Sequence, residues 1–196
     1  MMVCMIVSLS GLCQKFPFQY WHSGHAVLTT GDTLNGEVKY DLVKDIIRVN
    51  TGSKIHTISA RKIFFFEILD VTVDTYRQFY SLPFNLTTDY KSFLIFEVVF
   101  EGQMTLLARE TIENKTSQYN SQYWSGGTYS RQVLTYDFYF LDNKGNITFF
   151  TKKKRDLISI LYKKRSEIDK YIRKNSLKMD RKRDLARIIS YYNAII

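Results

Sequence analysis

Cysteine and proline are scarce in this chain, and their scarcity excludes two kinds of protein. Of 196 residues only 2 are Cys and 2 are Pro, and both cysteines, Cys4 and Cys13, lie within the first 13 residues. A small disulfide-stapled scaffold needs several cysteine pairs spread along the chain, so this fold must depend on its hydrophobic core. An extended proline-rich linker is excluded as well.

The motifs that identify the common enzyme classes are also missing. The chain holds no glycine-rich phosphate loop, no Gly-x-Ser-x-Gly, no His-Glu-x-x-His and no Cys-x-x-Cys. The acidic candidates for catalysis are Glu67, Asp70, Glu97 and Glu101, which lie on or beside predicted strands. Their spacing alone brings no two of them together for acid–base chemistry. We therefore expect neither catalysis nor a cofactor.

Histidine is equally scarce, with 3 in the whole chain. His22 and His25 are three residues apart and could share a metal, but a zinc site needs three or four ligands with supporting groups. No such ligands are evident nearby. We expect the two histidines to belong to an exposed segment before the first strand, and we predict no metal site.

A net positive charge is absent from most of the chain. Residues 152–196 hold 15 Lys and Arg against 5 Asp and Glu, whereas the preceding residues hold 13 against 14. The body is therefore not predicted to bind polyanions. A basic face of the C-terminal segment could either be solvated or contact anionic lipid or nucleic acid. Its candidate residues are Lys163, Lys164, Arg165, Arg181, Lys182 and Arg183.

The first 13 residues, MMVCMIVSLSGLC, are apolar and end in small residues, as in a secretory signal peptide. A membrane-spanning helix needs about 20 apolar residues, so this segment is too short for one. We expect cleavage after Cys13 and a location outside the cytoplasm: periplasmic, associated with the outer membrane, or secreted. A nucleic-acid partner is then not expected. The alternatives are a buried N-terminal strand and a lipoprotein modified at Cys13, although Leu12 stands where lipidation requires a small residue.

Aromatic residues are abundant, with 14 Tyr and 14 Phe, which favours strands. Apolar and polar residues alternate in GHAVLTTGDTLNGEVKYD around a turn bracketed by Gly31 and Gly36, and this pattern predicts a hairpin. Pro83 is interpreted as a turn. Further runs predict a strand at 61–70 and three more hairpins, at 45–59, 91–110 and 133–151. Residues 14–151 are thus predicted to be mostly antiparallel β, as an SH3-like roll, a barrel or a sandwich.

From residue 152 the apolar residues recur at helical spacing. The three groups are Leu157, Ile160 and Leu161; Ile168, Tyr171 and Ile172; and Leu185, Ile188, Ile189 and Tyr192. We therefore expect a three-helix appendage over 152–196, packed on the β domain. Together these elements predict an α+β fold.

Residues 117–131, SQYNSQYWSGGTYSR, are predicted to be a long loop. Tyr and Trp side chains among Ser, Asn, Gln and Gly suit a glycan or a protein partner. The alternative is a mobile hairpin tip whose aromatic rings fold back on the sheet. The candidate binding residues are Tyr119, Tyr123, Trp124 and Tyr129.

The chain resembles a family of secreted proteins of uncharacterised function that is common in Bacteroidota. The resemblance depends on the signal ending before Gln14, on GHAVLTTGDTLNGEVKYD and FEVVFEGQMTLLARE, and on the YYN of 191–193. It implies an exported β-rich domain with C-terminal helices, and no catalytic residues. We expect a non-catalytic binding or structural module of the cell envelope or extracellular space. The alternative is binding of an anionic membrane surface or nucleic acid through the basic helices.

Overall fold

The structure is a computed structural model that describes residues 15–87, 90–121 and 124–196. The predicted signal peptide, residues 1–13, lies outside the described residues. Within the described ranges, none of the helices has the length and apolar composition needed to cross a membrane.

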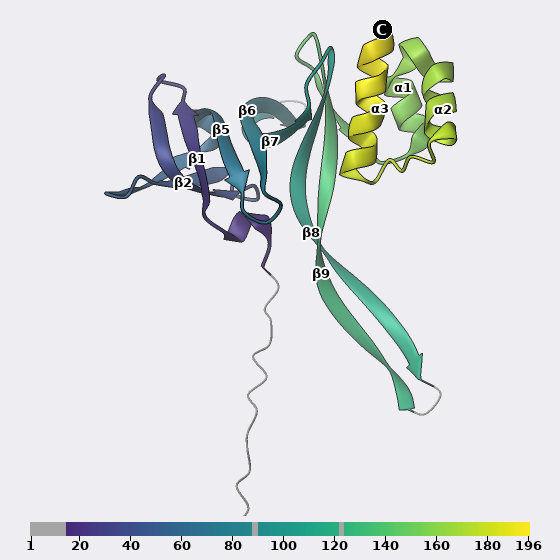
Figure 1. Cartoon of the computed structure of the whole chain (residues 1–196), viewed down its shortest axis with the longest axis horizontal. Coiled ribbons are helices and arrows are strands. Elements are labelled where there is room, and N and C mark those ends of the chain that lie inside the picture. Colours follow the sequence, from purple (N-terminus) through teal and green to yellow (C-terminus); the bar gives the residue numbers. More distant parts are fainter. Residues whose placement is uncertain (1–14, 88–89, 122–123) are drawn as a thin grey trace, which may run out of the picture.

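Ten antiparallel strands form one hydrogen-bonded sheet, and three helices follow it (Figure 1). The sheet order is β10-β9-β8-β7-β6-β5-β1-β2-β3-β4. This confirms the predicted α+β class and all four predicted hairpins. The strands are β1 (His22–Leu28), β2 (Thr33–Asp41), β3 (Ile46–Asn50), β4 (Ile55–Ser59), β5 (Ile63–Asp70), β6 (Thr75–Thr87), β7 (Tyr90–Phe100), β8 (Met104–Ser121), β9 (Trp124–Asp142) and β10 (Ile147–Phe150). The helices are α1 (Lys154–Ile160), α2 (Arg165–Lys174) and α3 (Lys182–Ile195), with 3-10 turns η1 (Pro17–Gln19), η2 (Ala60–Lys62) and η3 (Tyr162–Lys164).

The two glycines of the first hairpin have different roles, which corrects the prediction that both bracket its turn. Gly31 lies in the turn with φ +93°, whereas Gly36 lies inside β2 with φ +150°. Gly36 pairs directly with Gly24 of β1. A Cβ on Gly36 would lie 2.1 Å from the carbonyl oxygen of Asn50. Gly36 is therefore required by close strand approach rather than by chain reversal.

Pro83 is not at a turn, as predicted, but inside β6, opposite Phe93 of β7. The β5 pairing of β6 ends at Tyr80, so Pro83 lies where β6 has a partner strand on one side only. A missing N–H is tolerated there because no second neighbour needs it.

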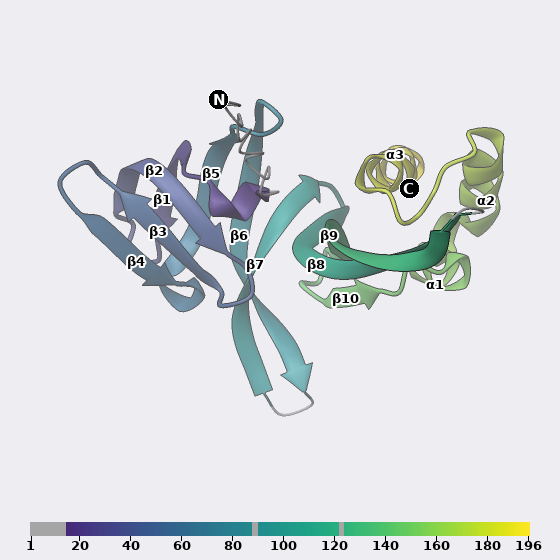
Figure 2. The same cartoon turned by 90° about the horizontal axis from the view of Figure 1, so that it is seen from below.

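The N-terminal half of the sheet curls around its own hydrophobic core (Figure 2). Alternate residues of β1, β2, β3 and β5 point inward, as the period of a strand requires. Phe66 and Phe79 stack at its centre, with ring centroids 4.6 Å apart. We call this cluster the first core; its members are Ala26, Val38, Tyr40, Leu42, Ile47, Val49, Ile58, Ala60, Ile63, Phe66, Ile68, Phe79 and Ile95.

A second core lies between β8, β9, β10 and the helices. Phe138 and Phe140 of β9 and Phe150 of β10 are buried against the helices. The predicted helical stripes face this sheet, because Leu157, Ile168, Leu185 and their neighbours in the pattern either belong to the cluster or, as Ile160 and Tyr171 do, pack against it. The appendage is therefore held by burial of one amphipathic face of each helix.

Asn193 of α3 fixes the last helix to the turn between β7 and β8. Its Oδ1 accepts the N–H of Met104 at 2.9 Å, and its Nδ2 donates to the Met104 carbonyl at 2.8 Å. A Cβ on Gly102 would lie 2.7 Å from this amide. The side chain thus supplies hydrogen bonds that the turn cannot make to itself.

Candidate functional site

The predicted loop 117–131 is instead the far end of the longest hairpin, which is a correction. β8 and β9 remain paired from Met104↔Asp142 to Ser121↔Trp124. The sequence is rich in Ser, Thr, Asn, Gln and Gly, which are depleted in strands, and the continuous ladder with a long partner overrides that local preference.

Residues 112–121 and 124–133 of this hairpin, which we call the arm, extend beyond the rest of the sheet (Figure 1). The β7 pairing of β8 ends at Ala108, and the β10 pairing of β9 ends at Phe138. Both outer edges of the arm are therefore unpaired in the described ladders. Such edges are templates for an added strand.

One face of the arm carries only uncharged side chains over three consecutive cross-strand pairs. These pairs are Asn114↔Gln132, Thr116↔Ser130 and Gln118↔Thr128. Their side chains lie on the same face of the sheet as Ala108 and Phe138. Along the hairpin, this face is therefore apolar and buried near the helices and polar on the arm. This face suits a partner recognised by neutral hydrogen bonds.

The opposite face of the arm carries charges. Lys115 lies directly opposite Arg131, and Glu113 precedes them opposite Val133. Like charges directly opposite each other destabilise a strand pair. Lys115 therefore has a cation, not an anion, as its cross-strand neighbour.

Three of the four predicted binding residues, Tyr119, Trp124 and Tyr129, fall in this hairpin. Tyr129 is 52% exposed and pairs with Ser117. Tyr119 and Trp124 are placed by register, opposite Gly127 and Ser121. Tyr123 lies outside the described residues. Of the four predicted aromatic side chains, Tyr129 is the one whose exposure the structure describes.

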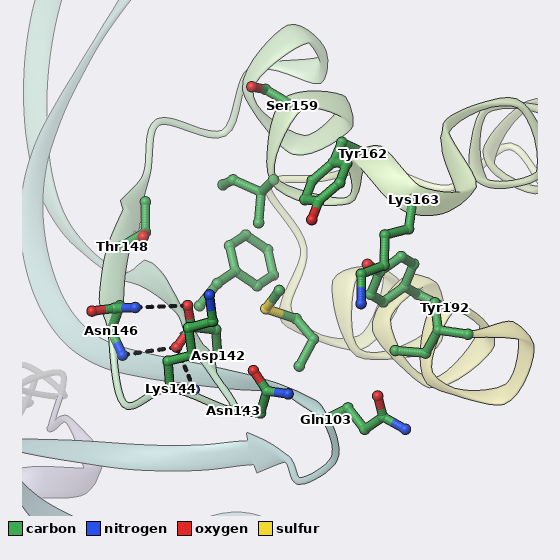
Figure 3. Close-up of a pocket in the computed structure, with 14 residues that line it drawn as sticks. Gln103, Asp142, Asn143, Lys144, Asn146, Thr148, Ser159, Tyr162, Lys163 and Tyr192 are labelled. Carbon is green, nitrogen blue, oxygen red and sulfur yellow. Dashed lines mark hydrogen bonds between the residues drawn. The ribbon is translucent and has the colours of Figure 1, made fainter.

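The six predicted basic-face residues are spread over the appendage. Lys163 lines a cavity of about 410 Å³ between the β9–β10 turn and the helices (Figure 3). Arg165 lines a depression with α1 residues, and Arg183 lines another with Tyr171 and Tyr191. Lys182 is half-buried and pairs with Glu97, so it is not part of an exposed basic face. Lys164 lies in η3, and Arg181 is the N-cap of α3.

The cavity in Figure 3 contains an acidic side chain, Asp142, that is already fully engaged. Its Oδ1 accepts the N–H groups of Lys144 and Asn146 at 2.8 and 2.9 Å, and its Oδ2 accepts the Asn146 amide at 2.9 Å. These bonds lower the pKa of Asp142. The carboxylate shapes the β9–β10 turn, and its lowered pKa is the reverse of what a general acid at neutral pH needs.

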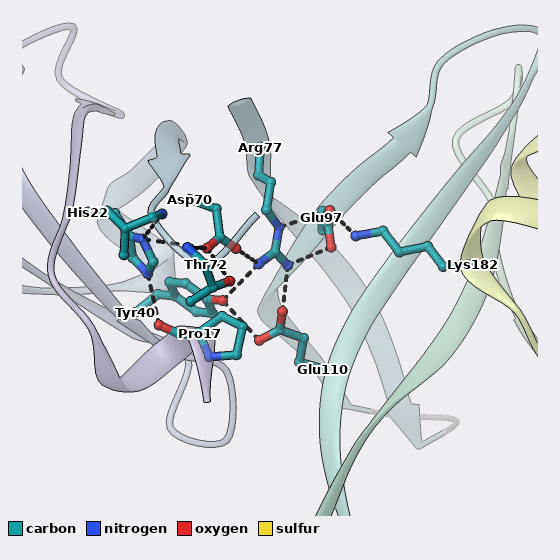
Figure 4. Close-up of polar contacts among 10 residues, drawn as sticks. Pro17, His22, Tyr40, Asp70, Thr72, Arg77, Glu97, Glu110 and Lys182 are labelled. Carbon is teal, nitrogen blue, oxygen red and sulfur yellow. Dashed lines mark hydrogen bonds and ion pairs between the residues drawn. The ribbon is translucent and has the colours of Figure 1, made fainter. Parts of the chain in front are cut away.

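Sequence reasoning missed a buried cluster around Arg77 of β6, which we call the Arg77 network (Figure 4). Its guanidinium donates to Asp70 at 2.7 Å, to Glu110 at 2.6 Å and twice to Glu97, at 3.1 and 2.8 Å. A fifth bond, of 3.1 Å, reaches the Tyr40 hydroxyl, which in turn donates to Glu110 at 2.9 Å. All five N–H groups of Arg77 are therefore used.

The network joins the two cores. Tyr40 and Arg77 come from the N-terminal half, Glu97 from β7 and Glu110 from β8. Lys182 at the start of α3 adds an ion pair to Glu97. A second contact between the halves is the ion pair between Arg109 of β8 and Asp45, at 2.7 Å.

The charges of the Arg77 network set the protonation of its acids. Burial alone would raise the pKa of Glu97, but Arg77 and then Lys182 outweigh it, so the pKa lies below its ordinary value. Burial likewise opposes the hydrogen bonds from Thr72 and Arg77 that leave the pKa of Asp70 lowered. Both groups are held as carboxylates, whereas a general acid at neutral pH needs a raised pKa. Neither carboxylate is therefore suited to act as a general acid.

His22 is buried, which corrects the expectation of an exposed segment. Its Nε2 donates to the Pro17 carbonyl at 2.8 Å, and its Nδ1 accepts the N–H of Val71 at 3.2 Å. Both ring nitrogens are therefore occupied. His25 lies three residues along β1 and so on the other face of the strand. Among the described residues, no cluster of three or more His, Cys, Asp or Glu side chains is arranged to hold a metal.

The four acidic candidates separate into two groups. Asp70 and Glu97 meet at Arg77, together with Glu110, which the sequence did not suggest. Glu67 instead accepts a hydrogen bond from Gln78 at 2.7 Å near the surface, and Glu101 is exposed in the β7–β8 turn.

Two features thus stand out: the arm, with its uncharged polar face and unpaired edges, and the Arg77 network, with its buried arginine bonded to three carboxylates. Comparison with family models, with curated protein sequences and with solved structures found no match for the chain.

Proposed function

We propose that this protein is an exported, non-catalytic module of the cell envelope or extracellular space that binds a partner through the β8–β9 arm. The observation that carries the proposal is the projection of a two-stranded ribbon with an uncharged hydrogen-bonding face beyond both cores. An isolated two-stranded hairpin is marginally stable in water, so a partner surface would add to its stability. The apolar N-terminal segment supports export.

The chemistry of the arm favours an envelope protein or a glycan as the partner. On one face of the arm, Asn, Gln, Ser and Thr side chains donate and accept neutral hydrogen bonds, and Tyr129 offers a flat ring on the other face. Binding through such groups depends little on ionic strength. Contact between the basic helices and a polyanion would instead weaken steeply as salt rises.

Shortening the arm is expected to abolish binding to the cell envelope. In the test variant, residues 114–132 are replaced by Asn-Gly, which closes the hairpin after the Glu113↔Val133 pair with a favoured turn. The measurement is cosedimentation of the purified chain with envelope fractions of native cells, at low and at high salt. Wild type should bind at both salt concentrations and the shortened chain at neither.

The matched control changes the other candidate surface. A variant with Lys163→Glu, Lys164→Glu and Arg165→Glu should bind like wild type. If this charge variant loses binding, if salt removes binding, or if the shortened chain still binds, the arm is not the binding site.

A further inference from the structure

We infer that a second copy of this chain pairs with the unpaired edge of β8, in an antiparallel arrangement with Asn114 on the two-fold axis. This inference rests on the proposed role of the arm as a binding site and names one partner for it. The proposed interface is the stretch of β8 just beyond the end of the β7 pairing. There the edge of β8 that faces away from β9 has no strand neighbour in the described ladders.

The charge order along β8 is self-complementary. Glu113 and Lys115 flank Asn114 and point to the same face of the ribbon. An antiparallel pair of β8 strands centred on Asn114 places Glu113 opposite Lys115 of the second copy, and Lys115 opposite Glu113 of the second copy. Both contacts are ion pairs, and the two-fold axis relates them as two copies of the same Glu113–Lys115 contact.

The strand of the second copy places an anion opposite Lys115, which the single chain does not. Within one chain the residue opposite Lys115 is Arg131, another cation. In the pair, Lys115 lies between Arg131 of its own chain and Glu113 of the second copy. The pairing also turns a two-stranded ribbon into a four-stranded sheet, which removes one exposed edge from each chain.

The added strand can pair with β8 only as far as the stretch that β7 leaves free, because β7 pairs with β8 at Ala108 and Leu107, so the second copy bends away from this edge beyond Ser117. The pairing places Ser117 of the second copy opposite Thr111. Thr111 and Ile112 line a cleft of about 430 Å³ between β8 and the β2–β3 turn, together with Leu42 and Val43. Val43 is 90% exposed there and Ile112 is 40% exposed. Both side chains can be covered by the approaching arm.

The test exchanges the two charges on the full chain. Sedimentation velocity over a concentration series from micromolar to submillimolar should show a wild-type monomer–dimer equilibrium. Glu113→Lys alone and Lys115→Glu alone each place like charges opposite each other, so each variant should be monomeric. Mixed in equal amounts, the two variants should form a heterodimer, and the double exchange should restore the homodimer. Lys144→Glu, an exposed change of the same charge on the β9–β10 turn, should leave the dimer unchanged.

Three results would overturn the inference: a wild-type chain that is monomeric throughout, single variants that dimerise like wild type, or mixed variants that fail to associate. None of these three results bears on whether the wild-type and shortened chains cosediment with the envelope, which tests the proposed function. A dimer that forms while the shortened chain still binds the envelope would refute the proposed function and leave the pairing intact.

Discussion

Replacing Arg77 with Met is expected to lower the free energy of unfolding by about 3–5 kcal/mol, because it leaves buried carboxylates without their cation. Asp70, Glu97 and Glu110 are all buried, and each contacts the guanidinium within 3 Å. The measurement is urea unfolding followed by circular dichroism. Arg61→Met, at an exposed arginine, is the matched control and should change stability by less than about 0.5 kcal/mol.

Two companion measurements distinguish this cause from a loss of packing. Adding Glu110→Gln to the Arg77→Met chain removes an unpaired buried charge and should recover part of the loss, whereas Glu97 keeps Lys182 as a partner. A loss below about 1 kcal/mol for Arg77→Met, or no recovery in the combined variant, would contradict the account.

The pH dependence has a definite sign. The folded-state pKa values of Asp70 and Glu97 are lowered from ordinary values of 3.8 and 4.5, so the stability they contribute is present above those values and is lost as pH falls below them. Wild type should therefore lose stability as pH falls below about 4.5. In the Arg77→Met chain the unpaired acids gain from protonation, so its stability difference from wild type should shrink on acidification.

Gly36→Ala is expected to lower the free energy of unfolding by about 3 kcal/mol or more, because it combines backbone strain with a steric clash. The residue has φ +150°, and an added Cβ would lie 2.1 Å from the Asn50 carbonyl oxygen, which belongs to a paired strand and cannot move alone. The measurement is again urea unfolding.

Gly31→Ala separates the two causes. Gly31 has φ +93°, but an added Cβ would meet no atom within 4 Å. Only the backbone cost of about 1–2 kcal/mol should then remain. Equal losses at the two glycines would show that the close approach of β2 to β3 has no energetic effect.

The strands and helices could be predicted from the sequence because their signal is local. The alternation in residues 133–142 and the helical spacing of Leu185, Ile188, Ile189 and Tyr192 each place apolar side chains on one face. The arm was wrongly predicted as a loop because its composition is that of a loop. Its strand structure comes from cross-strand pairing. Over much of the arm the two paired residues are 12 or more positions apart in the sequence, as in Asn114↔Gln132.

The Arg77 network could not be assembled from spacing, since its partners are 7 to 37 residues from Arg77. A signal was nevertheless present. Arg77 is in phase with Phe79, Glu97 with Ile95, and Glu110 with Ala108, so each charged residue occupies a core-facing position of its strand. Charges in such positions must be paired when buried. Which charge pairs with which still depends on the strand order.

Export is the claim on which the functional proposal depends most, and N-terminal sequencing of the chain recovered from fractionated native cells tests it most directly. The account predicts a chain that begins at Gln14 and is found in a periplasmic, membrane or secreted fraction. A chain that begins at Met1 and is found in the cytoplasm would contradict it, and the basic helices would then become the leading candidate for the binding surface.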